Sequence, residues 1–416
     1  AYSAAWNIAE EPFIKNKLKW MNMFKLRYSY GKVGSDYVGG TRFPYLAEFG
    51  NQNNTSYQWA DYNNNNKYNA LTYTRIASSN ITWEIATKHD LGIDLSLWND
   101  KFTATVDYFH ETRDGIYLQR ENLPQIVGLN GLKPYANIGK IRSTGFDGNF
   151  ALHHKIDKVD LTVRGNFTYG KNKILEYDET NSVYPYRRNA GWRVNQAKGL
   201  IALGLFKDYE DIRNSPTQTF GTVMPGDIKY KDMNGDGVID ELDKTNCGNN
   251  VPKVTWGLTN NFSYKGIELS IFMDGVSKCN LINLGKKETT QSRGNVRGYW
   301  RDRWRSPEQP GNGRVPRACT TDNLTTPSDW WLEDASFWRI RNINIAYNFP
   351  QSLMSKISFI SNCRIYFSMD NVYMHDHYNH MAQNAPFSNS NLTPGVDYDS
   401  GYPLARTYQF GINVKF

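Results

Sequence analysis

Long apolar runs are missing from this chain of 416 residues, of which only 39% are hydrophobic. A membrane-spanning helix needs ~20 successive apolar residues, so a helical membrane protein is excluded. The mean hydropathy of −0.64 does not indicate solubility, because a strand of a membrane barrel contacts lipid only at every second residue. The length allows two or three soluble domains or one large barrel, and the aromatic content of 14%, with 27 Tyr and 12 Trp, favours the barrel.

Cysteine is also sparse, and Cys247, Cys279, Cys319 and Cys363 have no C-x-x-C spacing typical of zinc or redox sites. Cys279 and Cys319 flank one loop and are able to form a disulfide at an oxidising cell surface; the alternative is four free thiols. Positive charge is dispersed, because 48 Lys and Arg are scattered among 41 acidic residues. This pattern does not indicate nucleic-acid binding. The chain also lacks G-x-S-x-G, H-E-x-x-H and glycine-rich phosphate-binding motifs, so we expect no enzymatic activity.

The end of the chain has the pattern of a strand with one apolar face. Between residues 407 and 416 polar and apolar side chains alternate, and the last residue is Phe416. In a soluble fold such a strand would fray or leave an adhesive edge, whereas a closed barrel pairs it on both sides. The pattern resembles the assembly signal of bacterial outer-membrane barrels, with Gln409, Gly411, Val414 and Phe416 as its predicted positions. The alternative is a soluble β-domain that ends on Phe.

The same alternation recurs along the chain and predicts ten strands, preceded by the rest of another at residues 1–8. The predicted strands cover about 24–30, 91–97, 102–108, 136–153, 159–169, 254–264, 267–273, 337–349, 364–372 and 407–416.

The predicted connections alternate between short and long. Short turns fall near Asn99, Lys155 and Lys265, and long polar loops cover residues 34–84, 115–135, 172–253, 277–336 and 373–404. Soluble sandwiches rarely separate loop lengths in this way, whereas outer-membrane barrels have short periplasmic turns and long extracellular loops. We therefore predict an all-β, transmembrane, antiparallel barrel with long extracellular loops. Loops of this size favour a barrel of about 22 strands with a plugged lumen.

Four segments together resemble the SusC/RagA family of TonB-dependent outer-membrane transporters of the Bacteroidetes. In chain order they are LRYSYGKVG at 26–34, PGDIKYKDMNGDGVID at 225–240, WLEDASFWRIRNINIAYNFP at 331–350 and GYPLARTYQFGINVKF at 401–416. The resemblance implies a nutrient importer in the bacterial cell outer membrane, with a SusD-like surface lipoprotein as its lid and oligosaccharides or peptides as cargo. It also implies energy from TonB-ExbB-ExbD acting through the plug, and a dimer of SusC-SusD pairs.

The resemblance further implies that residues 1–416 are the C-terminal portion of the barrel, about 10–11 strands. The plug, the TonB box and the remaining N-terminal part of the transporter are then expected to lie outside this chain. A start that reads like the end of a strand, without a signal peptide, agrees with a fragment.

A calcium-type motif lies within the loop of residues 172–253. The segment DMNGDGVIDELD at 232–243 fits the twelve-residue calcium loop, in which Gly237 permits the sharp turn. The departure is position twelve, where an aspartate replaces the usual bidentate glutamate. We predict structural Ca²⁺ held by Asp232, Asn234, Asp236, Val238, Asp240 and Asp243. The alternative is a cluster of Asp-Gly and Asn-Gly turns that only solvates the loop.

Two further segments carry residues with binding chemistry. Aromatic faces beside guanidinium groups suit stacking and hydrogen bonding to a glycan, which makes Trp300, Arg301, Trp304, Trp330 and Trp331 candidate substrate-binding residues; packing of the loop is the competing interpretation. The three histidines of the segment at 375–380 have spacing that can hold a transition metal, although a polar surface segment is the simpler interpretation.

Two other functions stay open at this point. The first is a secreted, calcium-stabilised, β-rich glycan-binding protein, which would purify without detergent, unlike a membrane barrel. The second is a surface glycoside hydrolase, which would release reducing ends from a polysaccharide.

Overall fold

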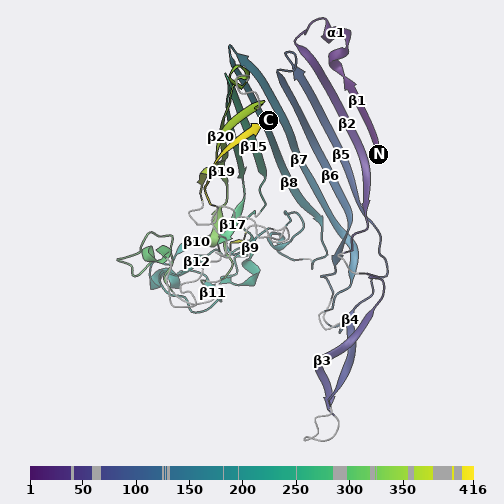
Figure 1. Cartoon of the computed structure of the whole chain (residues 1–416). Helices are drawn as coiled ribbons and strands as arrows, with labels where there is room; N and C mark the ends of the chain where they lie inside the picture. Colours follow the sequence, from purple (N-terminus) through teal and green to yellow (C-terminus); the bar gives the residue numbers. More distant parts are fainter. Residues whose placement is uncertain are drawn as a thin grey trace.

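A single antiparallel sheet of eleven strands dominates the computed structural model (Figure 1). The structure describes residues 1–38, 42–58, 67–123, 126, 128, 132–180, 182–194, 196–249, 251–283, 298–318, 324, 326–354, 360–377, 396–397 and 405–416. In sheet order the strands are β1 (Tyr2–Asn7), β2 (Met21–Ser35), β5 (Glu84–Leu97), β6 (Phe102–Gln119), β7 (Tyr135–Ile156), β8 (Val159–Glu176), β15 (Val254–Tyr264), β16 (Ile267–Ser277), β19 (Phe337–Asn348), β20 (Asn362–Asp376) and β22 (Thr407–Lys415).

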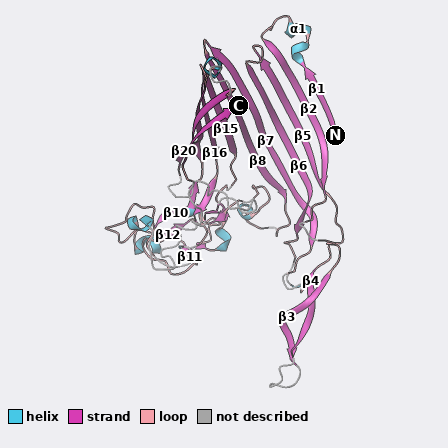
Figure 2. Ribbon diagram, in the orientation of Figure 1, coloured by secondary structure: helices cyan, strands magenta, loops and turns pink. Residues whose placement is uncertain are grey.

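The remaining strands belong to the connections, and apart from the β3–β4 hairpin they are two to four residues long (Figure 2). They are β3 (Glu48–Gln58), β4 (Lys67–Arg75), β9 (Lys198–Gly199), β10 (Ala202–Leu205), β11 (Thr217–Gln218), β12 (Ile228–Tyr230), β13 (Val238–Ile239), β14 (Thr245–Asn246), β17 (Asn280–Asn283), β18 (Leu332–Asp334) and β21 (Val396–Asp397). The helical turns are η1 (Ile8–Glu10), α1 (Pro12–Lys15), η3 (Pro185–Arg187), α2 (Tyr209–Arg213), η4 (Glu241–Asp243), η5 (Gly298–Asp302), η6 (Asp329–Trp331) and α5 (Gln351–Met354). None of the helices in the described ranges has the length and apolarity to cross a membrane.

The two ends of the sheet differ in their connections. At one end, the short-turn end, β5 joins β6 through Trp98, Asn99 and Asp100, all at positive φ, and β7 joins β8 through Asp157 at φ 53°. The β15–β16 turn at Lys265 and Gly266 also has positive φ, as two-residue hairpin turns require. At the opposite, long-loop end lie the β3–β4 hairpin and the short strands β9 to β12 (Figure 1). The predicted alternation of short and long connections therefore appears as one end with short turns and one end with long loops.

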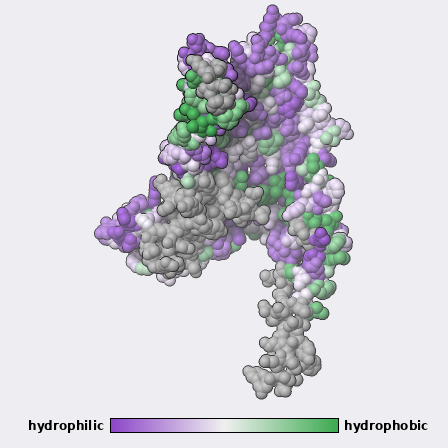
Figure 3. All heavy atoms as spheres, in the orientation of Figure 1, coloured by the Kyte–Doolittle hydropathy of each residue, from purple (hydrophilic) through white to green (hydrophobic). Residues whose placement is uncertain are grey.

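One face of the sheet is apolar across its strands because the register aligns the apolar positions. One cross-strand row consists of Leu97, Phe102, Leu152 and Val163, and another consists of Leu161, Phe262, Leu269, Ile345, Phe367 and Phe410. Phe410 is 72% exposed, so this face is not a soluble core. Figure 3 shows apolar residues gathered over the β19–β20 region and hydrophilic residues at the short-turn end. An outward apolar band of this kind is the surface that lipid covers.

Strand β19 contains a bulge at Arg341, where the pairing with both β16 and β20 shifts by one residue. On one side of the bulge Ile343 and Ile345 lie on the apolar face. On the other side Trp338 and Ile340 lie on the same apolar face, although their numbers are even and those of Ile343 and Ile345 are odd. The extra residue therefore keeps the apolar face continuous and leaves Arg339 on the polar face.

Candidate functional site

The polar face of the sheet carries a group of linked charges on β2, β5 and β6. The Arg27 guanidinium donates to the two carboxylate oxygens of Asp94 at 2.8 and 3.0 Å and to Asp107 Oδ1 at 2.8 Å. Arg27 reaches β6 by crossing Gly92, where an added Cβ would lie 2.2 Å from Asp107 Oδ1 and 2.6 Å from Arg27 Cζ. A side chain at position 92 would therefore displace this network. One guanidinium thus bridges two carboxylates, so the wall presents a hydrophilic surface here whose charges are hydrogen-bonded to one another.

Further polar pairs follow on the same face of β16, β19 and β20. Asp274 accepts hydrogen bonds from Arg339 at 2.8 and 3.0 Å, and Glu268 accepts one from Arg364 at 3.0 Å. Asn342 donates a hydrogen bond to Asp370 on β20 at 2.7 Å. A sheet with one apolar and one ion-paired face separates lipid from a wet interior, as the wall of a wide barrel does.

Two long loops fold together at the long-loop end into one unit, which we call the cap. It consists of the described residues of 198–246, from the β8–β15 connection, and of 298–332, from the β16–β19 connection. Its core residues are no more than 2% exposed and are Leu200, Ile228, Tyr230, Ile239, Trp300, Val315, Leu324 and Trp331. Because both loops supply core residues, the cap buries apolar surface that neither loop would bury alone.

Backbone and side-chain hydrogen bonds join the two loops at Leu200. Leu200 N donates to Pro327 O at 2.9 Å, and Asp329 N donates to Leu200 O at 3.0 Å. The Asp329 carboxylate accepts a hydrogen bond from Ala202 N at 2.7 Å. Burial raises the pKa of Asp329, while the hydrogen bond from Ala202 opposes that effect.

An ion pair makes a second connection between the loops. Arg317 donates to the two oxygens of Asp227 at 2.8 and 3.0 Å, and the Asp227 side chain is only 2% exposed. The same carboxylate accepts a hydrogen bond from Met224 N at 2.8 Å, and Arg317 N donates to Gly226 O at 2.9 Å. A buried, bidentate pair of this kind fixes the relative position of the segments that it joins.

The structure corrects the sequence-based assignment of Trp300 and Trp331 to substrate binding. Their exposed fractions are 0% and 1%, and Trp331 Nε1 donates to Leu324 O at 3.1 Å inside the cap core. A ring without an exposed face has no surface on which a sugar can stack, so both rings are structural. Trp330 packs against the same core, whereas Arg301 lies at the surface.

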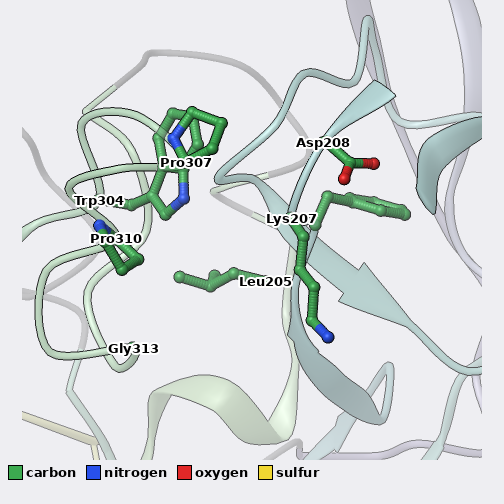
Figure 4. A pocket seen from close by; sticks show the side chains of 8 residues that line it. Leu205, Lys207, Asp208, Trp304, Pro307, Pro310 and Gly313 are labelled. Carbon is green, nitrogen blue, oxygen red and sulfur yellow. The ribbon is translucent and has the colours of Figure 1, made fainter. Parts of the chain in front are cut away.

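Trp304, the remaining candidate, lines a pocket of about 400 Å³ where the two cap loops meet. Figure 4 shows Trp304, Pro307 and Pro310 on one side and Leu205, Lys207 and Asp208 on the other. Trp304 also covers Gly226, which has φ +86° and whose added Cβ would lie 2.2 Å from the indole ring. The pocket therefore has apolar walls with one cation and one anion, and its shape depends on the joining of the two loops.

The predicted calcium loop is closed by its own hydrogen bonds. Asp232 accepts hydrogen bonds from Gly235 N at 2.6 Å and from Gly237 N at 2.9 Å. Asp236 N donates to Asn234 Oδ1 at 3.1 Å, and Asp236 Oδ1 accepts a hydrogen bond from Val238 N at 2.8 Å. These are the contacts of the turn-cluster interpretation, although a carboxylate oxygen that accepts one hydrogen bond keeps a lone pair for a cation.

The end of this loop forms a capping box. Asp243 is fully buried and accepts hydrogen bonds from Met233 N and Asp240 N, each at 2.8 Å, while Asp240 accepts one from Leu242 N at 2.7 Å. Among the residues that the structure describes, no three His, Cys, Asp or Glu side chains are grouped to hold a metal ion. Calcium binding, with Val238 as a backbone ligand, therefore stays a prediction.

The other candidate residues lie apart from the cap core. His375 and His377 have ring centroids 5.6 Å apart, but His380 lies outside the described residues. Cys279 is a buried free cysteine whose pKa burial raises to about 11, and Cys319 is another residue that the description does not cover. Burial raises the pKa of the Cys247 thiol to about 12. Protonated thiols are poor nucleophiles and poor metal ligands.

The predicted assembly signal lies on the last strand. Gln409, Gly411 and Val414 belong to β22, which pairs with β20, and Phe416 follows it with 81% of its surface exposed. Ser361 N donates to Lys415 O at 2.7 Å, which places this end beside the β19–β20 connection at the short-turn end. The position agrees with the expected periplasmic location, while its role in assembly stays a prediction.

Comparison with known proteins identifies the family. The model of the TonB dependent receptor-like β-barrel family matches residues 15–372. TonB-dependent receptor P26 of Formosa agariphila is 28% identical over 435 residues, which cover 100% of this chain and 42% of that receptor. TonB-dependent receptor SusC of Bacteroides thetaiotaomicron is 24% identical over 425 residues, which cover 99% and 39%. The chain thus spans about two fifths of the length of these curated relatives.

Solved structures support the same fold. The structure of the RagAB peptide transporter matches with a TM-score of 0.74 at 19% identity, covering 100% of this chain and 43% of the other. The open-open state of the RagAB peptide importer matches with a TM-score of 0.74 at 18% identity, covering 100% and 42%. These matches confirm the predicted β-barrel class and the resemblance to the SusC/RagA group. The chain belongs to the TonB-dependent receptor-like β-barrel family, whose members are outer-membrane proteins.

Proposed function

We propose that this chain is the C-terminal wall and cap of a SusC-like importer that takes up oligosaccharides or peptides. The observation that carries the proposal is the two-sided sheet, which is apolar on one face and ion-paired on the other. Such a wall separates lipid from a polar passage but performs no bond chemistry, which agrees with a transporter rather than an enzyme. Transport by the whole protein would need a plug and TonB-ExbB-ExbD.

Cargo capture in this proposal involves the pocket beside Trp304. The indole and the two prolines offer flat apolar surface, and Lys207 and Asp208 offer opposite charges on the facing side (Figure 4). A peptide presents apolar side chains together with charged groups, and an oligosaccharide presents C–H faces together with hydroxyls, so both classes find complementary groups here. One similar structure is named a peptide transporter, and the name of the relative SusC states no cargo, so both peptides and oligosaccharides stay in the proposal.

The cap also supports the proposal of a SusD-like lipoprotein as partner. Its two loops form a folded unit with its own core at the long-loop end, which is the extracellular end in barrels of this type. A rigid outer surface of this kind suits a lid that opens and closes over the barrel. The solved structure of the RagAB peptide transporter has the same fold.

The test is energy-dependent uptake by the full-length transporter with its lid in a host that lacks its own copy. Cells receive a fluorescent peptide mixture and, separately, a labelled oligosaccharide mixture. We expect one class to accumulate and to cease accumulating when the proton gradient is collapsed. The absence of gradient-dependent accumulation of both classes would refute the importer proposal.

Variants of two tryptophans test the role of the pocket. Trp304→Ala is expected to lower uptake at least five-fold, because it removes the largest apolar wall of the pocket, an effect on the order of 1 kcal/mol or more. Trp98→Ala is the control, since Trp98 lies in the β5–β6 turn at the opposite end and is stacked on Trp20. Equal uptake by the two variants at equal surface levels would remove the pocket from the mechanism.

A further inference from the structure

A group of cations lies on the lipid-facing side of β7 and β8, near the long-loop end. Arg142 is the cross-strand partner of Lys173, and Lys171 is paired with Thr144. Their parity places them on the same face as Phe146 and Tyr169, which are partners in the apolar surface of the wall. We call Arg142, Lys171 and Lys173 the basic rim. All three are exposed, and within the described part of the chain none of their side chains takes part in a hydrogen bond or an ion pair.

The position of the basic rim relative to the membrane follows from the residues next to it. Phe146 and Tyr108 form an aromatic pair with ring centroids 5.0 Å apart, and Tyr169 continues this aromatic belt on β8. Tyrosine and other aromatic rings gather at the membrane–water interface. Arg142 and Lys173 lie four residues beyond Phe146 and Tyr169, and Lys171 lies two residues beyond, which corresponds to about 7–13 Å along a strand. The cations are therefore at the level of the lipid head groups.

The basic rim is electrostatically unfavourable by itself. Directly opposed residues have Cβ atoms about 5 Å apart, and like charges in such a pair destabilise a sheet. Lys140, two residues before Arg142 on β7, forms an ion pair with Asp114 at 2.7 Å. Within the described part of the chain, no carboxylate forms such an ion pair with the three side chains of the basic rim. Lys278 adds a fourth positive charge, because its Nζ lies 6.0 Å from the centre of the Tyr169 ring. An external anion would offset this repulsion.

We propose that the basic rim binds the phosphate-bearing head group of a lipid in the outer leaflet of the outer membrane. A lipid fits better than a free anion because the surface continues from the cations to exposed apolar side chains. Phe146 is 47% exposed, and Leu152 and Val163 are partners lower on the same face. Phosphate oxygens would pair with the guanidinium and the ammonium groups while the acyl chains cover the aromatic belt. The inference rests on the orientation of the barrel and is independent of the cargo.

The experiment uses the full-length transporter purified in detergent and a titration with monophosphoryl lipid A, followed by native mass spectrometry. The test variant is Arg142→Gln with Lys171→Gln and Lys173→Gln. The control carries Lys17→Gln, Lys19→Gln and Lys158→Gln, three exposed lysines near the short-turn end. Each cation near an anionic lipid contributes about five-fold in affinity, so we expect the test variant to bind on the order of 100-fold more weakly. The control is expected to bind as the wild type does.

Three results would overturn the proposal. The first is equal binding by the test variant and the wild type, and the second is an equal loss in the control. The third is displacement of the lipid by millimolar inorganic phosphate, which would identify a site for a free anion instead. Unboiled electrophoresis verifies that both variants keep the folded barrel. Arg142→Lys provides a further check, because it retains the charge and is expected to retain most of the binding.

Discussion

The ion pair between Asp227 and Arg317 gives the sharpest prediction about the cap, because it joins two loops that are distant in sequence. We expect Arg317→Met to loosen the cap without affecting the wall. The substitution keeps an apolar stem but removes the two hydrogen bonds that Arg317 donates to Asp227. Of the three hydrogen bonds described above, the carboxylate, which is 2% exposed, then keeps the one from Met224 N. Removing one partner of a buried pair is costly because it leaves an uncompensated charge.

The magnitude follows from that geometry. Breaking buried ion pairs costs about 3–5 kcal/mol, and the remaining hydrogen bond places this case near the lower figure, about 3 kcal/mol. A free energy of this size raises the opening equilibrium of the cap on the order of 100-fold. The double variant Asp227→Asn with Arg317→Met removes the stranded charge as well, so it is expected to recover about 1–2 kcal/mol of the loss.

Hydrogen exchange of the full-length transporter measures this effect locally. Cap peptides that contain Ile228 and Val315 are expected to exchange on the order of 100-fold faster in Arg317→Met, whereas peptides from β5 and β6 are unchanged. The reasoning would be refuted if cap exchange rose less than about three-fold. It would also fail if the wall peptides changed to the same extent, because the pair would then not act within the cap.

Three further predictions concern the loops and the terminal strand. Calcium is expected to slow hydrogen exchange in residues 232–243 of the wild type but not of the matched control Asp236→Asn, and a chelator is expected to reverse the effect. If calcium does not slow exchange in the wild type, the hydrogen-bonded turn explains this segment without a metal ion. The hydrogen bond from Lys229 lowers the pKa of Asp211, so the pair stabilises the cap above pH ~3.9 and its contribution is lost as the pH falls through the lower pKa of the folded state. The difference in cap exchange between Lys229→Met and the wild type should therefore shrink steadily as the pH is lowered below ~3.9. Phe416→Ala is expected to reduce the heat-modifiable barrel seen on unboiled gels more than Phe13→Ala does, and equal yields would contradict the assembly signal.

Strand positions could be predicted from the sequence because alternation records which face of a strand meets lipid. The segment 254–264 was predicted with the bounds that β15 has, and the short turns at Asn99 and Lys265 lie where the structure places them. The predicted end of β6 was less accurate: the alternation predicted an end near residue 108, whereas β6 continues to Gln119, towards the long loops. Near the long loops the strands extend beyond the membrane, and lipid no longer imposes the pattern.

The cap could not be predicted in the same way. Its core joins residues such as Leu200 and Trp331 that are far apart in sequence, and its strands are two to four residues long, too short for a period to be visible. A Trp beside an Arg has the same composition in a binding site and in a packed core, and only burial separates the two. The pairs Arg27–Asp94 and Asp227–Arg317 were also missed, since a sequence does not show which loop or strand a charge will meet.

The extra residue in β19 limits how this wall can change in length. The apolar positions of β19 have even numbers before Arg341 and odd numbers after it. Deleting that one residue would therefore turn Arg339 towards the acyl chains and Ile340 towards water. An arginine that faces lipid costs up to about 2–4 kcal/mol, depending on its depth, and Asp274 would lose the hydrogen bonds that Arg339 donates to it. A one-residue insertion or deletion in a strand is therefore tolerable only where a bulge absorbs it. Chimeric barrels that exchange β19 have to take β16 and β20 with it.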